Sequence, residues 1–190
     1  MLNLLCPAAA SLLASIFAIG QRRLRNIIFF TALAHASLIA VTFSINLKIG
    51  ASYLLATVFS LAAMWYISAC LKSATGSDSI DDLGGLYESF PASTWAFITA
   101  AIMLSMFPPF PPFLAEHLAV EAAAVEPAAL LLLVLSRIML LACLFNAAHR
   151  IFFGKAKQLL DARENLRTAI PPVVFLFLSI ISEFILYGWV

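Results

Sequence analysis

Apolar residues dominate six stretches of this chain, and each stretch is long enough to cross a lipid bilayer. A spanning helix needs ~20 predominantly apolar residues, because each residue adds ~1.5 Å to the length of the helix. The pattern therefore predicts an all-α polytopic membrane protein that forms a single transmembrane domain over residues 1–190. The predicted spans are 2–19, 26–45, 51–71, 93–125, 127–149 and 170–190.

The fourth stretch is interrupted by two proline pairs in the sequence MFPPFPPFLAEHL, Pro108-Pro109 and Pro111-Pro112. Proline removes a backbone donor and breaks a helix. Inside a membrane, the backbone groups that a break frees must find partners within the protein or in a wet cavity. Broken helices at membrane depth are typical of ion and substrate paths in transporters. A kink that only shapes helix packing is the alternative, and the prolines alone do not decide between the two.

The basic residues indicate whether 93–125 crosses the membrane once or twice. Most arginines and lysines lie in the connections after the first, third and fifth stretches. A single interrupted crossing places these three connections on one side, which the positive-inside rule assigns to the cytoplasm or matrix. The sequence therefore predicts six crossings, one of them broken, with both termini on the outer side of the membrane.

Composition limits the classes of partner and ligand that the chain can bind. The chain is 63% hydrophobic and 11% charged with a net charge of +1, which argues against a nucleic-acid partner. We expect no cofactor and no metal, because a Gly-rich dinucleotide loop is missing from the sequence and Cys6, Cys70 and Cys143 are scattered. The expected partners are membrane lipids and other membrane polypeptides.

Three ionisable residues are expected at one depth in the membrane. Glu116 and Arg137 each lie roughly 15 Å from the turn at 126–127, and His35 lies at a similar depth before the turn at 46–48. This level is near the middle of a ~30 Å hydrocarbon core. An ionisable residue there costs at least ~2.5–3.5 kcal/mol on insertion scales, which makes each one a candidate functional residue. A purely structural ion pair between Glu116 and Arg137 is the alternative. His117 is rotated about 100° from Glu116 on a helix and is expected to face elsewhere.

Three sequence motifs are similar to one known family. These are GQRRLRNIIFFTALAHASLIAV, then DLGGLYESFPASTWAFITAAIMLSMFPPFPPFLAEHL, and finally NAAHRIFFGK. Together they resemble the antiporter-like, proton-pumping subunits of respiratory complex I, a family also found in cation/proton antiporters and membrane-bound hydrogenases. The resemblance extends over about residues 2–190, and the spacing from the proline pair to the charge is its most specific part.

The resemblance implies a fold and residue roles. Family members have fourteen helices with two inverted five-helix repeats, and this chain is similar to the second repeat plus the final helix. Glu116 occupies the position of the central lysine or glutamate on the broken helix, and His35 matches a polar residue of the central relay. Ser60 stands where some members have histidine or lysine, and Arg25 matches a basic loop residue. We add Arg137 to the expected proton relay.

From this resemblance we expect a split or truncated membrane-arm subunit of NADH:ubiquinone oxidoreductase that contributes to redox-coupled proton translocation without catalysing the redox reaction. Subunit 2 is slightly preferred over subunit 4. The expected partners include a chain that supplies the first repeat, and the expected location is the mitochondrial inner membrane or the bacterial plasma membrane. A subunit of a cation/proton antiporter or membrane-bound hydrogenase, or a non-conducting structural remnant, remains an alternative.

Overall fold

The computed structural model describes residues 4–105, 112–124, 126–155 and 164–187. Helices make up most of this part of the chain, so the prediction of an all-α protein is confirmed. The elements are α1 (Leu5–Ile19), α2 (Leu24–Ile45), α3 (Leu47–Thr75), α4 (Pro91–Met103), α5 (Pro112–Ala123), α6 (Pro127–Ala148), the π-helical turn η1 (His149–Phe153) and α7 (Leu166–Tyr187).

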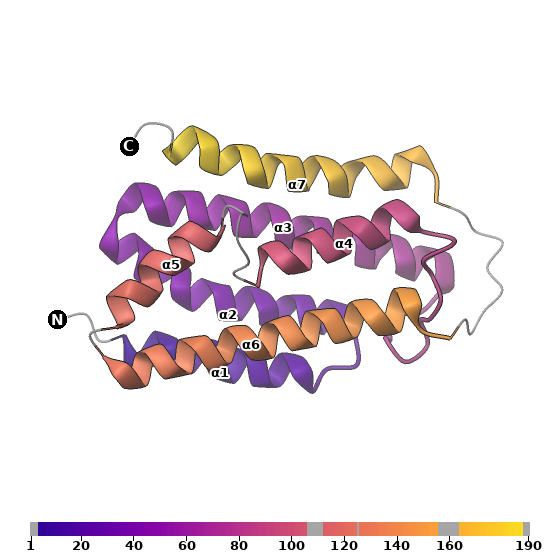
Figure 1. Ribbon diagram of the computed structural model, residues 1–190. Helices are drawn as coiled ribbons and strands as arrows, with labels where there is room; N and C mark the ends of the chain where they lie inside the picture. The colour runs from indigo at the N-terminus through magenta and orange to yellow at the C-terminus, as the bar shows by residue number, and fades with distance from the viewer. Residues whose placement is uncertain (1–3, 106–111, 125, 156–163, 188–190) are drawn as a thin grey trace.

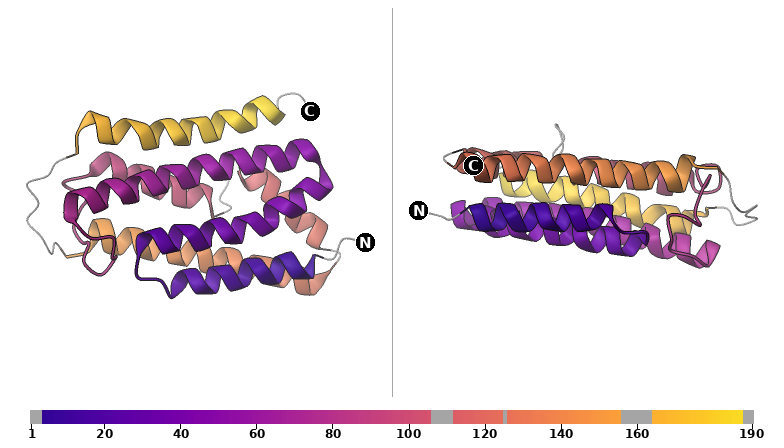
Figure 2. Two further views of the ribbon diagram at one scale, coloured as in Figure 1. Left: turned by 180° about the vertical axis from the view of Figure 1, so that it is seen from behind. Right: turned by 90° about the horizontal axis from the view of Figure 1, so that it is seen from below.

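The long helices run side by side and form two layers (Figures 1 and 2). One layer contains α1, α2 and α3, with α7 packed along α3. The other layer contains α6 together with α4 and α5. A large apolar cluster joins the layers around Phe97 and Phe152. A smaller cluster, which includes Tyr53, Ala115 and Leu133, lies around the polar site described below.

Helices α4 and α5 form one interrupted crossing, as the charge pattern predicts. They contain 13 and 12 residues, so each is roughly 20 Å long and too short for a ~30 Å hydrocarbon core. Figure 1 shows that they follow one another along the bundle, each in one half of it. The helix stops at Met103 and resumes at Pro112. The predicted break residues Pro108, Pro109 and Pro111 lie outside the described residues.

The other spans agree with the predicted stretches. Three segments are long and apolar enough to cross a membrane alone, namely Leu24–Ile45, Leu47–Thr75 and Pro127–Phe153. Helices α1 and α7 complete the bundle, and α1 begins at the same end of it at which α7 finishes (Figure 1). The fold is therefore a bundle of six membrane crossings, one of them broken.

The connections that carry the basic residues meet at one end of the bundle. The Leu24 N–H donates to the Asp78 carbonyl at 2.9 Å, and the Ile80 N–H donates to the Arg22 carbonyl at 2.8 Å, which joins the α1–α2 connection to the α3–α4 connection. The Leu86 N–H donates to the carbonyl of Ile151 in η1 at 3.2 Å. Ile151 is in the last turn of the helix, where carbonyl groups have no partner within the helix. All three connections thus lie on the same side.

Two adjacent glycines permit this assembly of connections. A Cβ atom on Gly84 would lie 2.4 Å from the Lys155 carbonyl oxygen, so the backbones approach too closely for any side chain. Gly85 has a φ of 68°, a left-handed conformation that glycine adopts without strain. The DLGGL motif is therefore explained by packing against the end of η1.

An ion pair closes the α3–α4 connection. Lys72 Nζ lies 3.2 Å from Asp78 Oδ2. Desolvation of Asp78 alone would raise the pKa of its carboxyl, but the hydrogen bond and the charge of Lys72 outweigh it and lower that pKa. The Lys72–Asp78 ion pair therefore stabilises the fold above the pKa that Asp78 has in the unfolded chain. This stabilisation is lost as the pH falls through the lowered pKa of Asp78 in the folded state.

At the opposite end, α2 and α3 are joined by the single residue Asn46. Its side chain accepts from the Lys48 N–H at 2.8 Å and caps α3. A Cβ atom on Gly50 would lie 2.5 Å from the Phe43 ring, so glycine allows the two helices to pack closely beside this turn. The short turn holds α2 and α3 in a fixed relation, which matters because each contributes to the site.

Sidedness can be tested by cysteine labelling. In a background in which Cys6, Cys70 and Cys143 are replaced by serine, we introduce Lys48→Cys or Glu88→Cys, because both positions are exposed and lie at opposite ends of the bundle. A membrane-impermeant maleimide should label Glu88→Cys from the cytoplasmic or matrix side and Lys48→Cys from the outer side. Detergent-solubilised protein should label at both positions. Labelling of both from one side would contradict the six-crossing topology, and the reverse pattern would overturn the sidedness alone.

Candidate functional site

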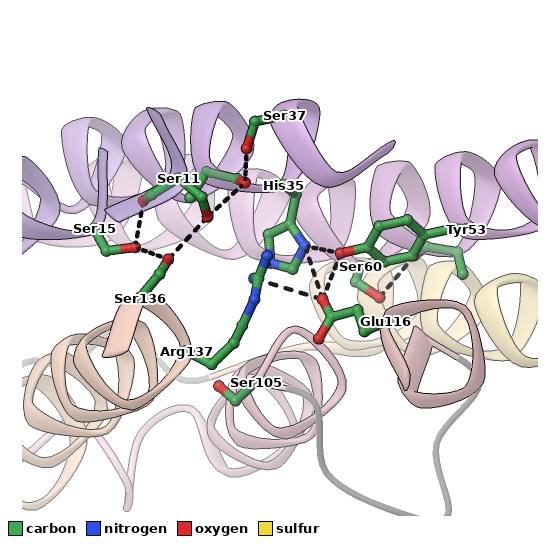
Figure 3. A network of polar contacts seen from close by, with 12 residues as sticks. Ser11, Ser15, His35, Ser37, Tyr53, Ser60, Ser105, Glu116, Ser136 and Arg137 are labelled. Carbon is green, nitrogen blue, oxygen red and sulfur yellow. Dashed lines mark hydrogen bonds and ion pairs between the residues drawn. The ribbon is translucent and has the colours of Figure 1, made fainter. Parts of the chain in front are cut away.

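The structure brings His35, Glu116 and Arg137 together between the two layers (Figure 3). All three side chains are buried. Arg137 Nη1 lies 3.5 Å from Glu116 Oε1, and His35 Nδ1 lies 3.3 Å from the same oxygen. Three helices that are distant in sequence thus place ionisable groups at one point, although a role in proton relay stays a prediction.

Tyr53 on α3 is a fourth member of the site that the sequence analysis missed. Its hydroxyl lies 2.7 Å from His35 Nδ1 and donates a short hydrogen bond to Glu116 Oε1. The side chain is fully buried and its ring packs edge-on against the imidazole. Tyr53 was missed because a tyrosine counts as apolar in a hydropathy pattern. The signal that could have found it is the tight turn at Asn46, which places Tyr53 and His35 at similar depths in the membrane.

The contacts determine which nitrogen of His35 carries the proton. An arginine guanidinium only donates, and Arg137 Nη1 lies 3.3 Å from His35 Nε2. Nε2 therefore accepts, and the proton of a neutral imidazole is on Nδ1, where it faces the Tyr53 oxygen. Assigned in this way, the hydrogen bonds run in one direction, from Arg137 to His35, from His35 to Tyr53 and from Tyr53 to Glu116.

The same contacts disfavour a positively charged His35. A doubly protonated imidazole would direct an Nε2–H bond at an N–H bond of Arg137, and two cations would then lie together in an apolar surround. With His35 neutral, the carboxylate and the guanidinium compensate each other. Two atoms of this ion pair, Glu116 Oε2 and Arg137 Nη2, are buried and have no hydrogen-bond partner within the described residues. The pair is therefore only partly satisfied, which makes it costly to bury and sensitive to a change of charge.

Buried serines extend the polar region between α1 and α6. Ser136, the neighbour of Arg137, lies 2.8 Å from the hydroxyls of both Ser11 and Ser15. Ser11 also donates to the Ala34 carbonyl on α2 at 3.1 Å. Hydrogen bonds between membrane helices contribute on average about 0.6 kcal/mol each. These serines hold α1, α2 and α6 together next to the site.

Ser60, which the family resemblance places at a relay position, does not contact the four site residues through any hydrogen bond that we observe. Its hydroxyl donates to the Ala56 carbonyl at 2.9 Å and lies 3.2 Å from the Ser179 hydroxyl on α7. Ser60 therefore links α3 to α7.

His117 faces away from the site, on the outer surface of α5. Its Nε2 lies 3.2 Å from Glu121 Oε1, and the two side chains are 47% and 61% exposed. Ionisable groups at this depth are not stable against lipid. This surface of α5 therefore requires a polar environment, supplied by water or by more protein.

A bundle of apolar helices with a broken crossing and a buried ion pair beside the break defines a polytopic membrane protein with a charged centre. Residues 1–141 match the family described as NADH:quinone oxidoreductase/Mrp antiporter, transmembrane region. The chain belongs to this family, and the resemblance seen in its motifs is confirmed.

Three curated relatives illustrate the range of the family. A Na(+)/H(+) antiporter subunit of Bacillus subtilis is 27% identical over 68% of this chain. NADH-quinone oxidoreductase subunit N of Deinococcus radiodurans is 28% identical over 91% of the chain. Subunit M of the NADH-quinone oxidoreductase of Mycobacterium tuberculosis is 31% identical over 55% of the chain. The matched regions make up 27%, 37% and 20% of these relatives, so the chain spans well under half of their length.

Solved structures share the fold. The Mrp complex of Dietzia sp. contains a chain that superposes with a TM-score of 0.77 at 20% identity, covering 98% of this chain and 44% of that one. Respiratory complex I of Thermus thermophilus contains a chain that superposes with a TM-score of 0.74 at 20% identity, covering 97% of this chain and 44% of that one. Both come from large membrane assemblies.

The ion pair makes a stability prediction. Glu116→Gln leaves the Arg137 guanidinium buried without an anion, which should cost about 3–5 kcal/mol. The double variant Glu116→Gln/Arg137→Gln removes both charges and should recover most of the loss. The measurement is the thermal unfolding midpoint and yield of the purified assembly in detergent.

Glu88→Gln is the matched control, because it makes the same chemical change at an exposed connection and should have little effect. If the double variant were as unstable as Glu116→Gln, the unpaired charge would not be the cause of the instability.

Proposed function

We infer that this chain is an antiporter-like membrane-arm subunit of a proton-translocating NADH:quinone oxidoreductase. The observation that carries this inference is the one-directional chain of hydrogen bonds from Arg137 through His35 and Tyr53 to Glu116. Such a chain ends on an ionisable carboxylate inside the membrane and can deliver a proton to it. The relative from Deinococcus radiodurans, which matches 91% of the chain, supports the assignment to this class of complex.

The proposed transfer conserves protons at each atom. A proton binds His35 at Nε2, and the proton on Nδ1 passes to the Tyr53 oxygen. The original hydroxyl proton of Tyr53 passes to Glu116 Oε1. His35 and Tyr53 end neutral, and Glu116 becomes a neutral carboxylic acid. The distances of 2.7 Å from His35 to Tyr53 and the short bond from Tyr53 to Glu116 are compatible with both steps.

Arg137 couples this transfer to conformation. In the starting state it is held by the Glu116 carboxylate at 3.5 Å and donates to His35 Nε2 at 3.3 Å. After the transfer the carboxylate has lost its charge and Nε2 carries a proton, so Arg137 loses an anion and an acceptor together. The guanidinium then has to find another partner, and α6 carries this change to its neighbours. Arg137 must move away from Nε2 before the proton binds there, and His35 has to return to its Nδ1–H tautomer before the next transfer.

The exposed pair on α5 supports a larger assembly around this chain. His117 and Glu121 require a polar neighbour at membrane depth, and the chain spans less than half of the family members that it resembles. We propose that the remaining part of an antiporter-like unit, with a first repeat, packs against this surface of α5. The named relatives are bacterial, which supports a bacterial plasma membrane over the mitochondrial inner membrane.

A subunit of a cation/proton antiporter is the second candidate. The relative from Bacillus subtilis and the structural likeness to the Mrp complex favour it. The absorbance spectrum of the purified assembly distinguishes the two candidates. Flavin and iron–sulfur bands are expected for an NADH:quinone oxidoreductase and not for a stand-alone antiporter.

Tyr53→Phe tests the proposed path. The substitution removes one hydroxyl and keeps the ring, so the Glu116–Arg137 ion pair remains and the assembly should form, with a loss of stability of about 1–3 kcal/mol from the unpaired neighbours. The hydroxyl that relays the proton between His35 and Glu116 is lost, which leaves 3.3 Å between Nδ1 and Oε1, and proton translocation should fall by about 10²-fold or more. The measurement is proton movement in proteoliposomes, driven by NADH oxidation.

Tyr87→Phe is the matched control, because Tyr87 lies in the exposed α3–α4 connection with its ring stacked on Phe153. It should translocate protons normally. Undiminished translocation in Tyr53→Phe would remove Tyr53 from the path. Undiminished translocation in the assembled double variant Glu116→Gln/Arg137→Gln would contradict the proposed site and favour a structural remnant.

A further inference from the structure

A long apolar groove lies on the face of the bundle formed by α2, α3 and α7, away from the proposed proton site. The groove has a volume of about 540 Å³ and is lined by apolar and aromatic residues, including Phe29, Ala32, Val58, Trp65 and Phe175. This face is turned toward the viewer in the left panel of Figure 2, where α2 and α3 lie in front of α4 and α5. Its volume is within the range of ligand sites in proteins, about 300–1,000 Å³.

The groove follows the direction of a lipid chain. On α3 its lining extends from Val58 to Ala69, which corresponds to roughly 16 Å along the helix. Measured from the level of Tyr53, the lining extends from roughly 8 Å to roughly 24 Å along α3, so the groove begins inside the hydrocarbon core and passes its edge. The alanines on α2 and α3 that line it leave room for a flexible chain between the helices.

A cation that the proton path does not use lies beside the groove. The guanidinium carbon of Arg25 lies 5.4 Å from the ring centroid of Trp65, a cation–π contact that holds the arginine next to a residue of the groove lining. Arg25 Nε is buried and has no hydrogen-bond partner within the described residues. Arg25 precedes His35 by ten residues, so it lies roughly 15 Å from the level of the proton site, near the edge of the hydrocarbon core.

Three carboxylates at this end of the bundle are engaged elsewhere. Asp78 pairs with Lys72 at 3.2 Å, and Asp81 pairs with Arg22 at 3.5 Å and with Arg150. Glu164 accepts from the N–H groups of Ala92 and Ser93, at 2.7 and 2.9 Å. Among the ion pairs that join described residues, none contains Arg25. Within the described residues, its charge therefore has no protein anion.

We propose that this groove binds an anionic glycerophospholipid, with one acyl chain between α2 and α3 and the phosphate on Arg25. An arginine guanidinium binds a phosphate through two parallel hydrogen bonds, for which its two terminal NH2 groups can be the donors. Trp65 lies at the depth where aromatic residues mark the membrane interface. Charge, depth and shape thus indicate the same ligand, and this inference does not depend on the proposed proton path.

The test uses native mass spectrometry of the purified, delipidated assembly after addition of phosphatidylglycerol or phosphatidylcholine with identical acyl chains. We expect phosphatidylglycerol to be retained at least several-fold better than phosphatidylcholine. Arg25→Gln should reduce retention of phosphatidylglycerol to the level of phosphatidylcholine, and Arg25→Lys should preserve part of the preference. Ala62→Phe, which fills the groove from α3, should reduce retention of both lipids.

Arg22→Gln is the matched control, because it removes the same charge three residues away from Arg25. The Arg22 side chain is 84% exposed and pairs with Asp81. This variant should retain phosphatidylglycerol as the unmodified protein does. An equal loss in Arg22→Gln would show diffuse attraction to a basic surface and would overturn the site. A photoreactive residue at Phe29 should crosslink to lipid, and a crosslink to another polypeptide would show that a protein helix occupies the groove instead.

Discussion

The structure depends on keeping one carboxylate and one guanidinium stable in the middle of a hydrocarbon layer. Neither Glu116 nor Arg137 is stable there alone, because lipid cannot solvate a charge. Their opposite charges compensate at 3.5 Å, while the Tyr53 hydroxyl donates a hydrogen bond to the same carboxylate and accepts one from neutral His35. The broken crossing belongs to the same constraint, because Glu116 lies in the first turns of α5, immediately after the interruption. The fold is therefore organised around a polar centre that needs four helices.

The two layers have different parts in this centre. His35 and Tyr53 come from α2 and α3, which are joined through one residue, whereas Glu116 and Arg137 come from α5 and α6 in the other layer. Glu164 caps the start of α4 through the Ala92 and Ser93 N–H groups and so ties that half-helix to the charged end of the bundle. Beyond the interruption, α5 is a separate helix. Its charge can respond to protonation while α4 stays in place.

The bundle and much of the site could be predicted from the sequence, because the membrane constrains the length, hydropathy and charge distribution of the segments that cross it. Length and hydropathy located the spans, the basic connections selected one broken crossing, and the distance from each turn placed His35, Glu116 and Arg137 at one level. Depth alone does not say which way a side chain points. In a membrane helix both the packed face and the lipid face are apolar, so the pattern carries little information on direction. Tyr53 was missed for this reason, and so was the serine cluster around Ser136, whose members are small and common in membrane helices.

The placement of the two charges on different helices gives proton binding a mechanical consequence. A carboxylate paired with a cation on its own helix could gain a proton with little effect on helix packing. In the proposed transfer, protonation of Glu116 would weaken the attraction between α5 and α6, and the tautomer shift of His35 would turn an acceptor for Arg137 into a donor that faces it. Both changes would act on Arg137 in the same direction, so the protonated and deprotonated states would prefer different arrangements of α6. A difference in interaction free energy between two arrangements is what any coupling between distant sites requires. Within the described part of the chain, Glu116 Oε2 and Arg137 Nη2 have no hydrogen-bond partner, so the observed arrangement leaves hydrogen bonds of the ion pair unmade.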